Sequence, residues 1–224
     1  MKRLFGIISS DVVNSTSLDR AAILQLRKDI YNNLFRDLAE IQSSFWGRVV
    51  RGDTLECCIS QAQYSFRIAL LTKCWMKNWA EANGGSSDMC RMGLRCSIGI
   101  GTMRIVDTKE DLLDGDAIYI AGRNLDYITG KNIPIAFGIN TSHTDVEDLI
   151  ESNLLLLDTL LCELTSRQSD VLYYKLMGYS EIKIARILGI SQTAVNLRAK
   201  NAGWQQIKAS LKVLENINFG EYVD

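Results

Sequence analysis

Hydrophobic residues change their spacing several times along the first 60 positions, and each spacing predicts a different element. Residues 4–13 form an apolar, β-branched run, which predicts a buried strand. From Asp19 to about Ser43, apolar residues recur every three or four positions, as on one face of a helix. Residues 46–60 contain two short apolar runs around Gly52-Asp53, and this dipeptide predicts a hairpin.

The same reasoning extends to residue 139. Residues 64–82 are predicted to form a helix and residues 92–103 a strand. Residues 107–114 are expected to form an acidic connection, residues 117–129 a helix ended by Gly130, and residues 134–139 a last strand. The order βαββαβαβ predicts an α/β (α+β) sandwich, in which helices pack on one mixed sheet.

Residues 144–164 have a leucine-rich helical pattern. Its central apolar positions alternate by four and three: Ile150, Leu154, Leu157, Leu161 and Leu164. Such a seam is typical of a dimerisation helix, but it spans fewer than three heptads and other leucines widen it. Two interpretations therefore stay open, a dimer contact and packing against the protein's own domains.

Three further helices are predicted after residue 164. Thr165 and Gln168 form a capping box that begins the first of them. Ser180 caps a helix over 181–188 and Ser191 caps one over 192–202, with the tight turn 188–191 between them. The last two helices form a helix-turn-helix, since Ala185 is small where they cross and Gly189 can adopt the positive φ of the turn.

The third of these helices presents the side chains expected to contact DNA. Glutamine and asparagine pair with adenine edges, and arginine and lysine bind guanine or phosphate, which points to Gln192, Thr193, Asn196, Arg198 and Lys200. The segment resembles the helix-turn-helix of sigma-factor region 4 and of LuxR-type regulators, in the residues Leu-Thr-x-Arg-Gln at 164–168, Gly-Tyr-Ser at 178–180, Ile-Ala at 184–185 and Leu-Gly-Ile-Ser at 188–191. The alternative is a helical hairpin that contacts another protein.

Charge supports the DNA interpretation. The net charge of the 224-residue chain is only −1, yet residues 165–212 carry eight basic and two acidic side chains, a net charge of +6. This predicts a polyanion, double-stranded DNA, as the partner of one end only. Because one recognition helix contacts a half-site, we also expect a homodimer. The expected domains are residues 1–140, 141–164 and 165–224.

Composition also bears on location and on metal sites. No apolar run approaches the 18 residues of a membrane span, and Asp11 follows the basic N-terminus too soon for a signal peptide, so we expect a cytoplasmic protein without membrane contact. The six cysteines form no CxxC pair and only His143 could join them, which argues against zinc. We expect reduced thiols, most of them buried.

Two aspartates mark a candidate metal site in the first domain. Asp11 ends the first predicted strand and Asp53 lies at the hairpin turn, so both carboxylates reach one sheet edge if these strands are neighbours. Two carboxylates fit Mg²⁺, which would bring the phosphates of a nucleotide. The backbone amides of residues 12–16 lead into a helix and are expected to cradle those phosphates. The alternative roles are a helix cap for Asp11 and an ordinary turn residue for Asp53.

These residues resemble motifs of class III nucleotide cyclases over about residues 4–139. The matching segments are Asp-Val-Val-Asn-Ser-Thr at 11–16, Arg-Gly-Asp at 51–53, the strand 94–101 and Ala-Gly-Arg at 121–123. The resemblance implies a palm-like mixed sheet, Asp11 and Asp53 as metal ligands, and ligand contacts by Asn14, Ser15, Thr16 and Arg123. Arg123 could instead be a surface ion-pair partner. Tyr119 and Val49 stand where that family has a catalytic Asn and a base-reading Lys, which puts turnover in doubt.

The chain also resembles a small bacterial SatD-type family. The shared features are Arg20 and Gln25 after the strand aspartate, the Gly-Asp hairpin, a Gly-Ile-Gly strand, and Asp-Gly-Asp-Ala at 114–117 before Arg123. We expect a transcriptional regulator that binds DNA and senses a nucleotide or another phosphorylated ligand. The alternatives are a nucleotide cyclase or nucleotidyltransferase targeted by its helix-turn-helix, and a protein-interaction adaptor.

Overall fold

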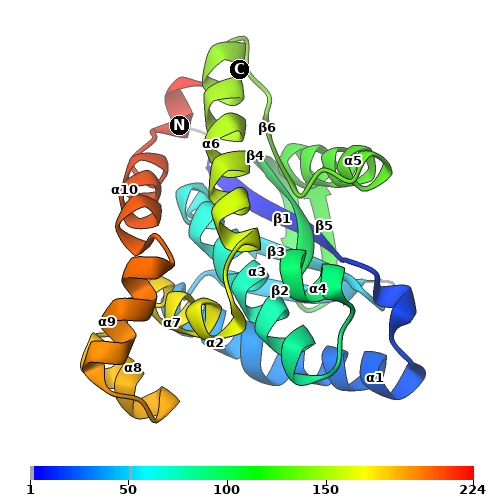
Figure 1. The fold of residues 1–224 in the computed structure, drawn as a ribbon. Helices are drawn as coiled ribbons and strands as arrows, with labels where there is room; N and C mark the ends of the chain where they lie inside the picture. Colours follow the sequence, from blue (N-terminus) through cyan, green and yellow to red (C-terminus); the bar gives the residue numbers. More distant parts are fainter. Residues whose placement is uncertain (1–2, 51) are drawn as a thin grey trace.

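A computed structural model describes residues 3–50 and 52–224 and shows a mixed α+β structure (Figure 1). Arg51, part of the predicted hairpin motif, lies outside these residues. Within them, six strands form one sheet: β1 (Leu4–Val12), β2 (Phe45–Val50), β3 (Thr54–Ile59), β4 (Leu94–Asp107), β5 (Leu112–Gly115) and β6 (Ile135–Ile139). The mixed sheet expected from the sequence is confirmed.

The strand order places β1 at the centre of the sheet. The order is β2-β3-β1-β4-β5 with antiparallel neighbours, and β6 joins β4 in parallel. β1 pairs with β3 rather than with β2, so that Asp11 lies opposite Thr54, the residue after Asp53. On the other side of β1, Asp11 lies opposite Arg95 of β4.

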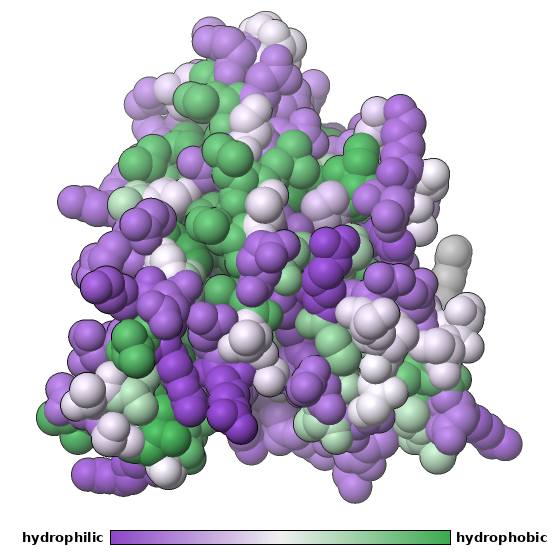
Figure 2. Space-filling model, in the orientation of Figure 1, coloured by the Kyte–Doolittle hydropathy of each residue, from purple (hydrophilic) through white to green (hydrophobic). Residues whose placement is uncertain are grey.

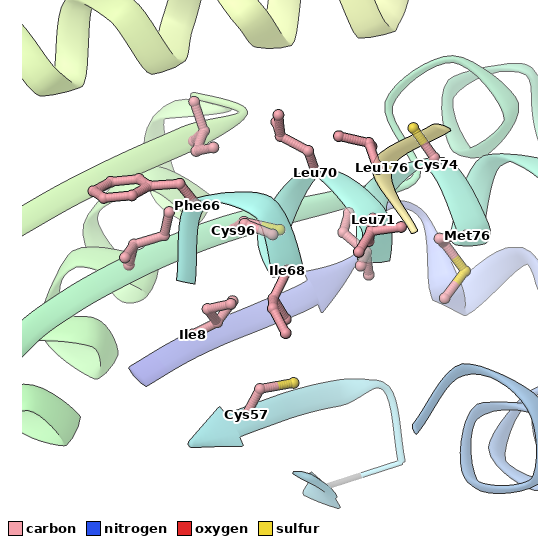
Figure 3. Close-up of a cluster of buried hydrophobic side chains, with 14 of the residues drawn as sticks. Ile8, Cys57, Phe66, Ile68, Leu70, Leu71, Cys74, Met76, Cys96 and Leu176 are labelled. Atoms are coloured by element: carbon pink, nitrogen blue, oxygen red, sulfur yellow. The ribbon is translucent and has the colours of Figure 1, made fainter. Parts of the chain in front are cut away.

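Helices cover both faces of this sheet because side chains alternate along each strand. Ile8 belongs to the face under α3 (Ser65–Ala82), where Phe66, Ile68 and Leu70 form the main core (Figure 3). Ile7 belongs to the opposite face, which packs on α5 (Asp116–Lys131).

Glycine makes the close approach of α5 to the sheet possible. A Cβ on Gly99 would lie 2.7 Å from the amide nitrogen of Ala121, and one on Gly101 would lie 3.0 Å from that of Ala117. The Gly-Ile-Gly run of β4 therefore serves helix packing on one side of the strand, while Ile100 enters the core on the other.

The helix expected from Asp19 to Ser43 is present in three consecutive pieces. They are α1 (Arg20–Asp29), a π-helical segment (Ile30–Phe35) and α2 (Arg36–Ile41). The side chain of Asp19 accepts a hydrogen bond from the amide of Ala22 and caps α1.

Three details of the predicted pattern are wrong. Residues 107–114 are not a loop throughout, because β4 runs on to Asp107 and pairs with β5. The loop after α3 contains a short helix, α4 (Ser87–Met92), capped by Ser86. Gly130 lies inside α5, which ends instead at Asn132 in the left-handed conformation.

The C-terminal part is helical, with the bounds that its capping residues predicted. The helices are α6 (Thr144–Cys162), α7 (Ser166–Leu176), α8 (Glu181–Leu188), α9 (Gln192–Asn201) and α10 (Trp204–Leu214). Thr165 and Gln168 make the capping box, Ser180 and Ser191 cap α8 and α9, and Gly189 has a φ of 63°. α10 was not predicted. No helix of the described residues is long and apolar enough to cross a membrane.

α6 lies along the body with a buried and an exposed apolar side. Ile150, Leu154, Leu157 and Leu161 are buried in the main core, so the helix packs against its own chain. Its outer side carries Leu149, Leu155, Leu156 and Leu160, which are exposed together with Val213 of α10. Figure 2 shows apolar surface on this face of the molecule. Dimerisation through α6 stays a prediction.

One core continues across the predicted domain boundary at residue 164. α7 packs on α3, and Leu172 and Leu176 belong to the same buried cluster as the sheet residues. Arg67 of α3 makes a two-pronged ion pair with Glu215, at 2.6 and 2.8 Å, and also donates to the carbonyl of Leu176.

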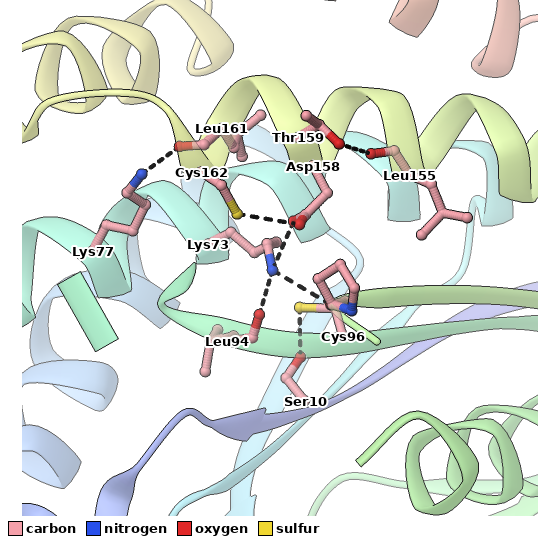
Figure 4. A network of polar contacts seen from close by, with 11 residues as sticks. Ser10, Lys73, Lys77, Leu94, Cys96, Leu155, Asp158, Thr159, Leu161 and Cys162 are labelled. Atoms are coloured by element: carbon pink, nitrogen blue, oxygen red, sulfur yellow. Dashed lines mark hydrogen bonds and ion pairs between the residues drawn. The ribbon is translucent and has the colours of Figure 1, made fainter. Parts of the chain in front are cut away.

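A buried ion pair joins α3, α6 and the sheet. The ammonium of Lys73 lies 2.8 Å from a carboxylate oxygen of Asp158, and both side chains are almost fully buried (Figure 4). Lys73 also donates to the carbonyl of Leu94, which begins β4, and, at 3.5 Å, to that of Pro134, which precedes β6. Burial is the largest effect and lowers the pKa of Lys73, but the charge and hydrogen bond of Asp158, together with the nearby thiols of Cys96 and Cys162, outweigh it, so that the pKa is raised.

Candidate ligand site and candidate nucleic-acid surface

The two predicted metal aspartates lie together at one edge of the sheet. β1 and β3 are antiparallel neighbours, and the amide of Val12 donates to the carbonyl of Asp53 at 3.3 Å. This backbone contact brings the end of β1 against the hairpin turn. The carboxylates of Asp11 and Asp53 are thus neighbours although 42 positions separate them in the sequence.

Asp11 is held where its negative charge is unfavourable. Burial raises the pKa of its carboxyl group above the usual range, and the charge of Asp53 raises it further. Arg95 opposes both effects through an ion pair at 3.5 Å. Asp11 lies within β1 and caps no helix, whereas Asp53 does lie in the hairpin turn, the alternative position considered for it. A cation between the two carboxylates would relieve their repulsion.

The loop after β1 carries the predicted ligand residues Asn14, Ser15 and Thr16. The hydroxyl of Ser15 donates to a carboxylate oxygen of Asp53 at 2.5 Å, so this residue orients the second aspartate. Asn14 has a φ of 53° and its side chain donates to Asp88 of α4 at 3.0 Å. Thr16 is exposed beside them.

Fewer backbone amides are available to a phosphate than the five predicted at residues 12–16. The amides of Val12 and Val13 already donate to the carbonyls of Asp53 and Gly93, at 3.3 and 3.1 Å, so they are not available to a phosphate. Only the amides of residues 14–16 are candidates. They enter a single 3₁₀ turn, Ser15–Ser17, rather than the helix that the sequence predicted.

Three polar side chains flank Asp11 on its own face of the sheet. Arg95 lies opposite Asp11, and Ser97 lies opposite Ser9, two residues further along both strands. Within the described part of the chain, the hydroxyls of Ser9 and Ser97 and the Nε of Arg95 are buried without a hydrogen-bond partner. Buried polar atoms of this kind call for a partner such as a water molecule or a ligand. The sequence predicts Arg95 and Ser97 in a strand that resembles a cyclase motif, but it marks none of the three as a site residue.

The donor set fits a magnesium ion that arrives with phosphates. Mg²⁺ is typically held by one or two carboxylates together with substrate oxygens and water. No cluster of three His, Cys, Asp or Glu side chains suited to a metal occurs among residues 3–50 and 52–224. Asp11 and Asp53 alone would therefore bind a free divalent ion weakly, and phosphate oxygens would complete its coordination.

The structure does not bring Arg123 to the two aspartates. Arg123 lies on α5, nine residues before Asn132, whose side-chain oxygen accepts from Arg95 beside Asp11 at 2.8 Å. That separation is about 13 Å along a helix axis. Arg123 instead lines a cavity of about 380 Å³ with Tyr119. Its remaining lining residues are Asp116, Ile120, Asn124, Gly138, Ile139, Asn140 and Glu147.

The two departures from the cyclase motifs have local structural roles. The hydroxyl of Tyr119 donates to Asp114 at 2.6 Å, and Arg104 holds the same carboxylate at 2.7 Å. Val49 is buried in the main core. Neither side chain can replace the amide or the ammonium that a cyclase uses at these positions.

α9 carries most of the predicted DNA-contacting residues on one exposed face. Val195 and Ala199 are buried against α7 and α8. On the opposite side, the exposed positions recur at helical spacing: Gln192, Thr193, Asn196, Leu197 and Lys200. The exposed face is polar apart from Leu197.

Arg198 and Asn196 are both near acidic side chains of the neighbouring helices. Arg198 is half-exposed, and its charge lowers the pKa of Asp170 of α7, which burial raises. Asn196 donates to Glu181 at 3.4 Å, and Glu181 is paired with Lys175 at 2.9 Å. These hydrogen bonds lower the pKa of Glu181, and the one from Lys175 has the largest effect.

The cysteines behave as the sequence predicted. All six are free thiols, four of them buried. Burial raises the pKa of Cys74 to about 11, so this thiol is protonated at neutral pH and is a poor metal ligand.

Comparison with known proteins gives partial similarities only. No protein-family model matches the sequence, and no curated protein matches it. Among solved structures, the chain is similar to an adenylate/guanylate cyclase/hydrolase from Silicibacter pomeroyi, with 23% identity over 57% of this chain and 71% of that chain, at a TM-score of 0.40. It is also similar to a bacterial light-regulated adenylyl cyclase, with 16% identity over 61% and 76% of the two chains, at a TM-score of 0.41. Similarity at this level establishes neither a family nor an activity.

Proposed function

We propose that the protein binds a nucleotide together with Mg²⁺ at the sheet edge formed by Asp11 and Asp53. One observation carries this proposal: the carboxylate of Asp11 in β1 and that of Asp53 in the hairpin turn are neighbours, and the charge of Asp53 raises the pKa of Asp11. Like charges held together destabilise a fold unless a cation or a proton compensates them. The arrangement therefore serves a ligand rather than the fold.

The surroundings of the aspartates support a phosphorylated ligand. Ser15 orients Asp53 by a hydrogen bond, and the amides of residues 14–16 lie in the same loop. Arg95 adds a positive charge next to Asp11, and Ser9 and Ser97 add buried hydroxyls. The sequence resemblance of residues 11–16 to the metal motif of nucleotide cyclases favours a nucleoside triphosphate.

Calorimetric titration tests the proposal. We expect ATP or GTP to bind in the presence of Mg²⁺, and much more weakly when EDTA replaces it. Asp11→Asn and Asp53→Asn should each abolish the Mg²⁺-dependent part. Asp145→Asn, which removes an exposed carboxylate from the first turn of α6, should leave it unchanged. Unaltered nucleotide affinity in both site variants would remove the proposed site.

Turnover is a separate question with its own measurement. Positioning is most of phosphoryl-transfer catalysis, and Tyr119 and Val49 cannot position a ribose or a base. We therefore expect the wild-type protein, incubated with Mg²⁺ and ATP or GTP, to return the nucleotide intact on chromatography. A cyclic or oligonucleotide product that disappears with Asp11→Asn would instead establish a nucleotide cyclase or nucleotidyltransferase.

DNA binding through α9 is the second function that we propose. The observation that favours it is the exposed face of Gln192, Thr193, Asn196 and Lys200, opposite the buried Val195. Glutamine and asparagine on an exposed helix can read adenine edges, and each good pair discriminates by about 1–3 kcal/mol. The net charge of +6 over residues 165–212 attracts the phosphates.

Selection of duplexes from a random pool, followed by anisotropy titrations, tests this second function. Gln192→Ala and Asn196→Ala should reduce the preference for selected over random duplexes, whereas Lys200→Ala should weaken both alike. Affinity that does not change with salt concentration would contradict DNA binding, because each phosphate contact releases counterions.

A further inference from the structure

A groove runs along the C-terminal helices beside the exposed face of α9. Two adjoining cavities of about 670 and 320 Å³ form it, and Lys175, Trp204 and Lys208 line both. The larger cavity extends to Asn196 and Lys200 at the edge of α9. We call this feature the Trp204 groove, and the proposed DNA-reading face continues directly into it.

The charged side chains of the Trp204 groove are mostly basic. Lys200 and Lys208 are exposed, and neither forms an ion pair with any residue that the structure describes. Lys175 is neutralised by Glu181, and Arg67 at the far end by Glu215. Two free cations therefore remain on its wall.

Neighbouring side chains add donors and an aromatic surface. Gln205 and Gln206 bring amide groups to the larger cavity, and Tyr179 lines the smaller one. The ammonium of Lys183 lies 3.2 Å from the centre of the Tyr179 ring, so a third cation stands next to the smaller cavity. Trp204 is half-buried and begins α10.

We propose that the Trp204 groove seats the phosphodiester backbone of the DNA strand that borders α9. The proposal rests on DNA binding by α9. Lys200 and Lys208 supply point charges for phosphates, and the Gln205 and Gln206 amides supply hydrogen-bond donors. Phosphate contacts made by a second helix fix the orientation of the recognition helix without reading sequence. In this arrangement α10 is part of the DNA interface, rather than only a support for α9.

A matched pair of lysines on α10 allows a sharp test. Lys208 lines the Trp204 groove, whereas Lys212 is one turn further along, exposed and outside both cavities. With the full-length protein and a labelled duplex, anisotropy titrations over a series of salt concentrations should show a loss of affinity for Lys208→Ala. The loss should be similar for selected and random sequences, and the salt slope should fall by about one. Lys212→Ala should keep the wild-type affinity and slope.

Tryptophan fluorescence gives a second readout. Duplex DNA should change the emission of the wild-type protein, and the change should be lost in Trp204→Phe, which keeps an aromatic ring at that position. The groove proposal would be overturned if Lys208→Ala and Lys212→Ala changed the DNA affinity equally and DNA left the Trp204 emission unchanged. DNA binding by α9 would still stand in that case if Asn196→Ala lost the preference for selected over random duplexes. Absence of salt-dependent duplex binding in the wild type would overturn both.

Titration with free nucleotides provides the last test of the groove proposal. The groove is large enough for a mononucleotide, since ligand pockets span about 300–1,000 Å³. ATP or GTP at concentrations that fill the Asp11 site should not alter the Trp204 emission. If they do, and if Lys208→Ala removes the effect, the occupant is a mononucleotide and the backbone proposal is wrong.

Discussion

At the scale of single residues, Asp11 shows how a site can be kept at the expense of stability. Burial raises the pKa of its carboxyl group, the charge of Asp53 raises it further, and Arg95 offsets these two effects only in part. The folded state therefore holds the proton more tightly than the unfolded state. The ionised carboxylate destabilises the fold at neutral pH, and this cost disappears as the pH falls through the raised pKa toward the usual value of 3.8.

Asp11→Asn is therefore expected to stabilise the protein while removing nucleotide binding. The gain in the free energy of unfolding should be about 0.5–2 kcal/mol at pH 7, the usual range for relief of a strained functional site. It should shrink as the pH is lowered toward 3.8, where the wild-type carboxyl group is protonated too. Urea unfolding of both proteins at several pH values measures the difference. A gain that does not depend on pH would contradict the electrostatic explanation.

Gly99 of β4, which packs against α5, and Gly122 of α5, which faces open space, provide a contrast between two glycines. Gly99→Ala should destabilise the protein by about 1–3 kcal/mol, because its Cβ would press on the backbone of α5. Gly122 lies within α5 and a Cβ there meets nothing within 4 Å, so Gly122→Ala should stabilise by roughly 0.5–1 kcal/mol. Thermal unfolding of both variants compares them. Similar shifts of Tm would show that α5 does not approach β4 so closely.

Sequence reasoning identified some site residues and missed others for a physical reason. Asp11 and Asp53 were predictable, because each carries a charge at the point where an apolar run ends. Asp11 ends the first strand, and Asp53 follows the second. Arg95, Ser9 and Ser97 became apparent only through the register of β1 and β4. Pairing partners across a sheet depend on strand order, which the spacing of hydrophobic residues does not contain.

At the scale of elements, helices with explicit capping residues were predicted to within a residue or two. Thr165, Ser180 and Ser191 all cap helices as expected. β5 was missed because it is only four residues long and pairs with the exposed end of β4, so that no apolar alternation marks it. α4 was missed because six residues are too few to show a helical period.

The buried pair of Lys73 and Asp158 determines how α6 is attached to α3 and the sheet. Asp158→Asn should cost about 3–5 kcal/mol, because it leaves the ammonium of Lys73 buried without a counter-charge. The double variant Lys73→Met with Asp158→Leu should recover most of that loss, since no charge is then buried. Chemical denaturation of the two variants and the wild type measures the recovery. A double variant no more stable than Asp158→Asn would contradict this account.

At the scale of the whole molecule, the C-terminal helices share their core with the sheet domain. Leu172, Leu176, Leu211 and Phe219 lie in the same buried cluster as the residues under α3. The ring of Phe219 packs against those of Phe66 and Phe137, with centroids 5.9 and 6.2 Å away. The predicted division at residue 164 thus does not coincide with a gap in the packing.

We therefore expect the described fold to unfold in a single cooperative transition. The helical signal in circular dichroism and the emission of Trp204, taken as the difference from Trp204→Phe, should change at the same urea concentration. Glu215→Gln, which weakens the ion pair with Arg67, should lower that midpoint for both signals together. A change of the Trp204 emission at a lower urea concentration than the change of the circular dichroism signal would show that the C-terminal helices unfold independently.

The placement of Phe219 also has a genetic consequence. A stop codon between positions 169 and 214 would remove all or part of α10 together with Phe219, and the apolar surfaces of Phe66 and Phe137 would be uncovered. Proteins with such exposed surfaces are removed by cellular proteases or aggregate. Late truncations should therefore lower the abundance of the whole polypeptide and behave as null alleles, rather than separate a nucleotide-binding product from a DNA-binding one.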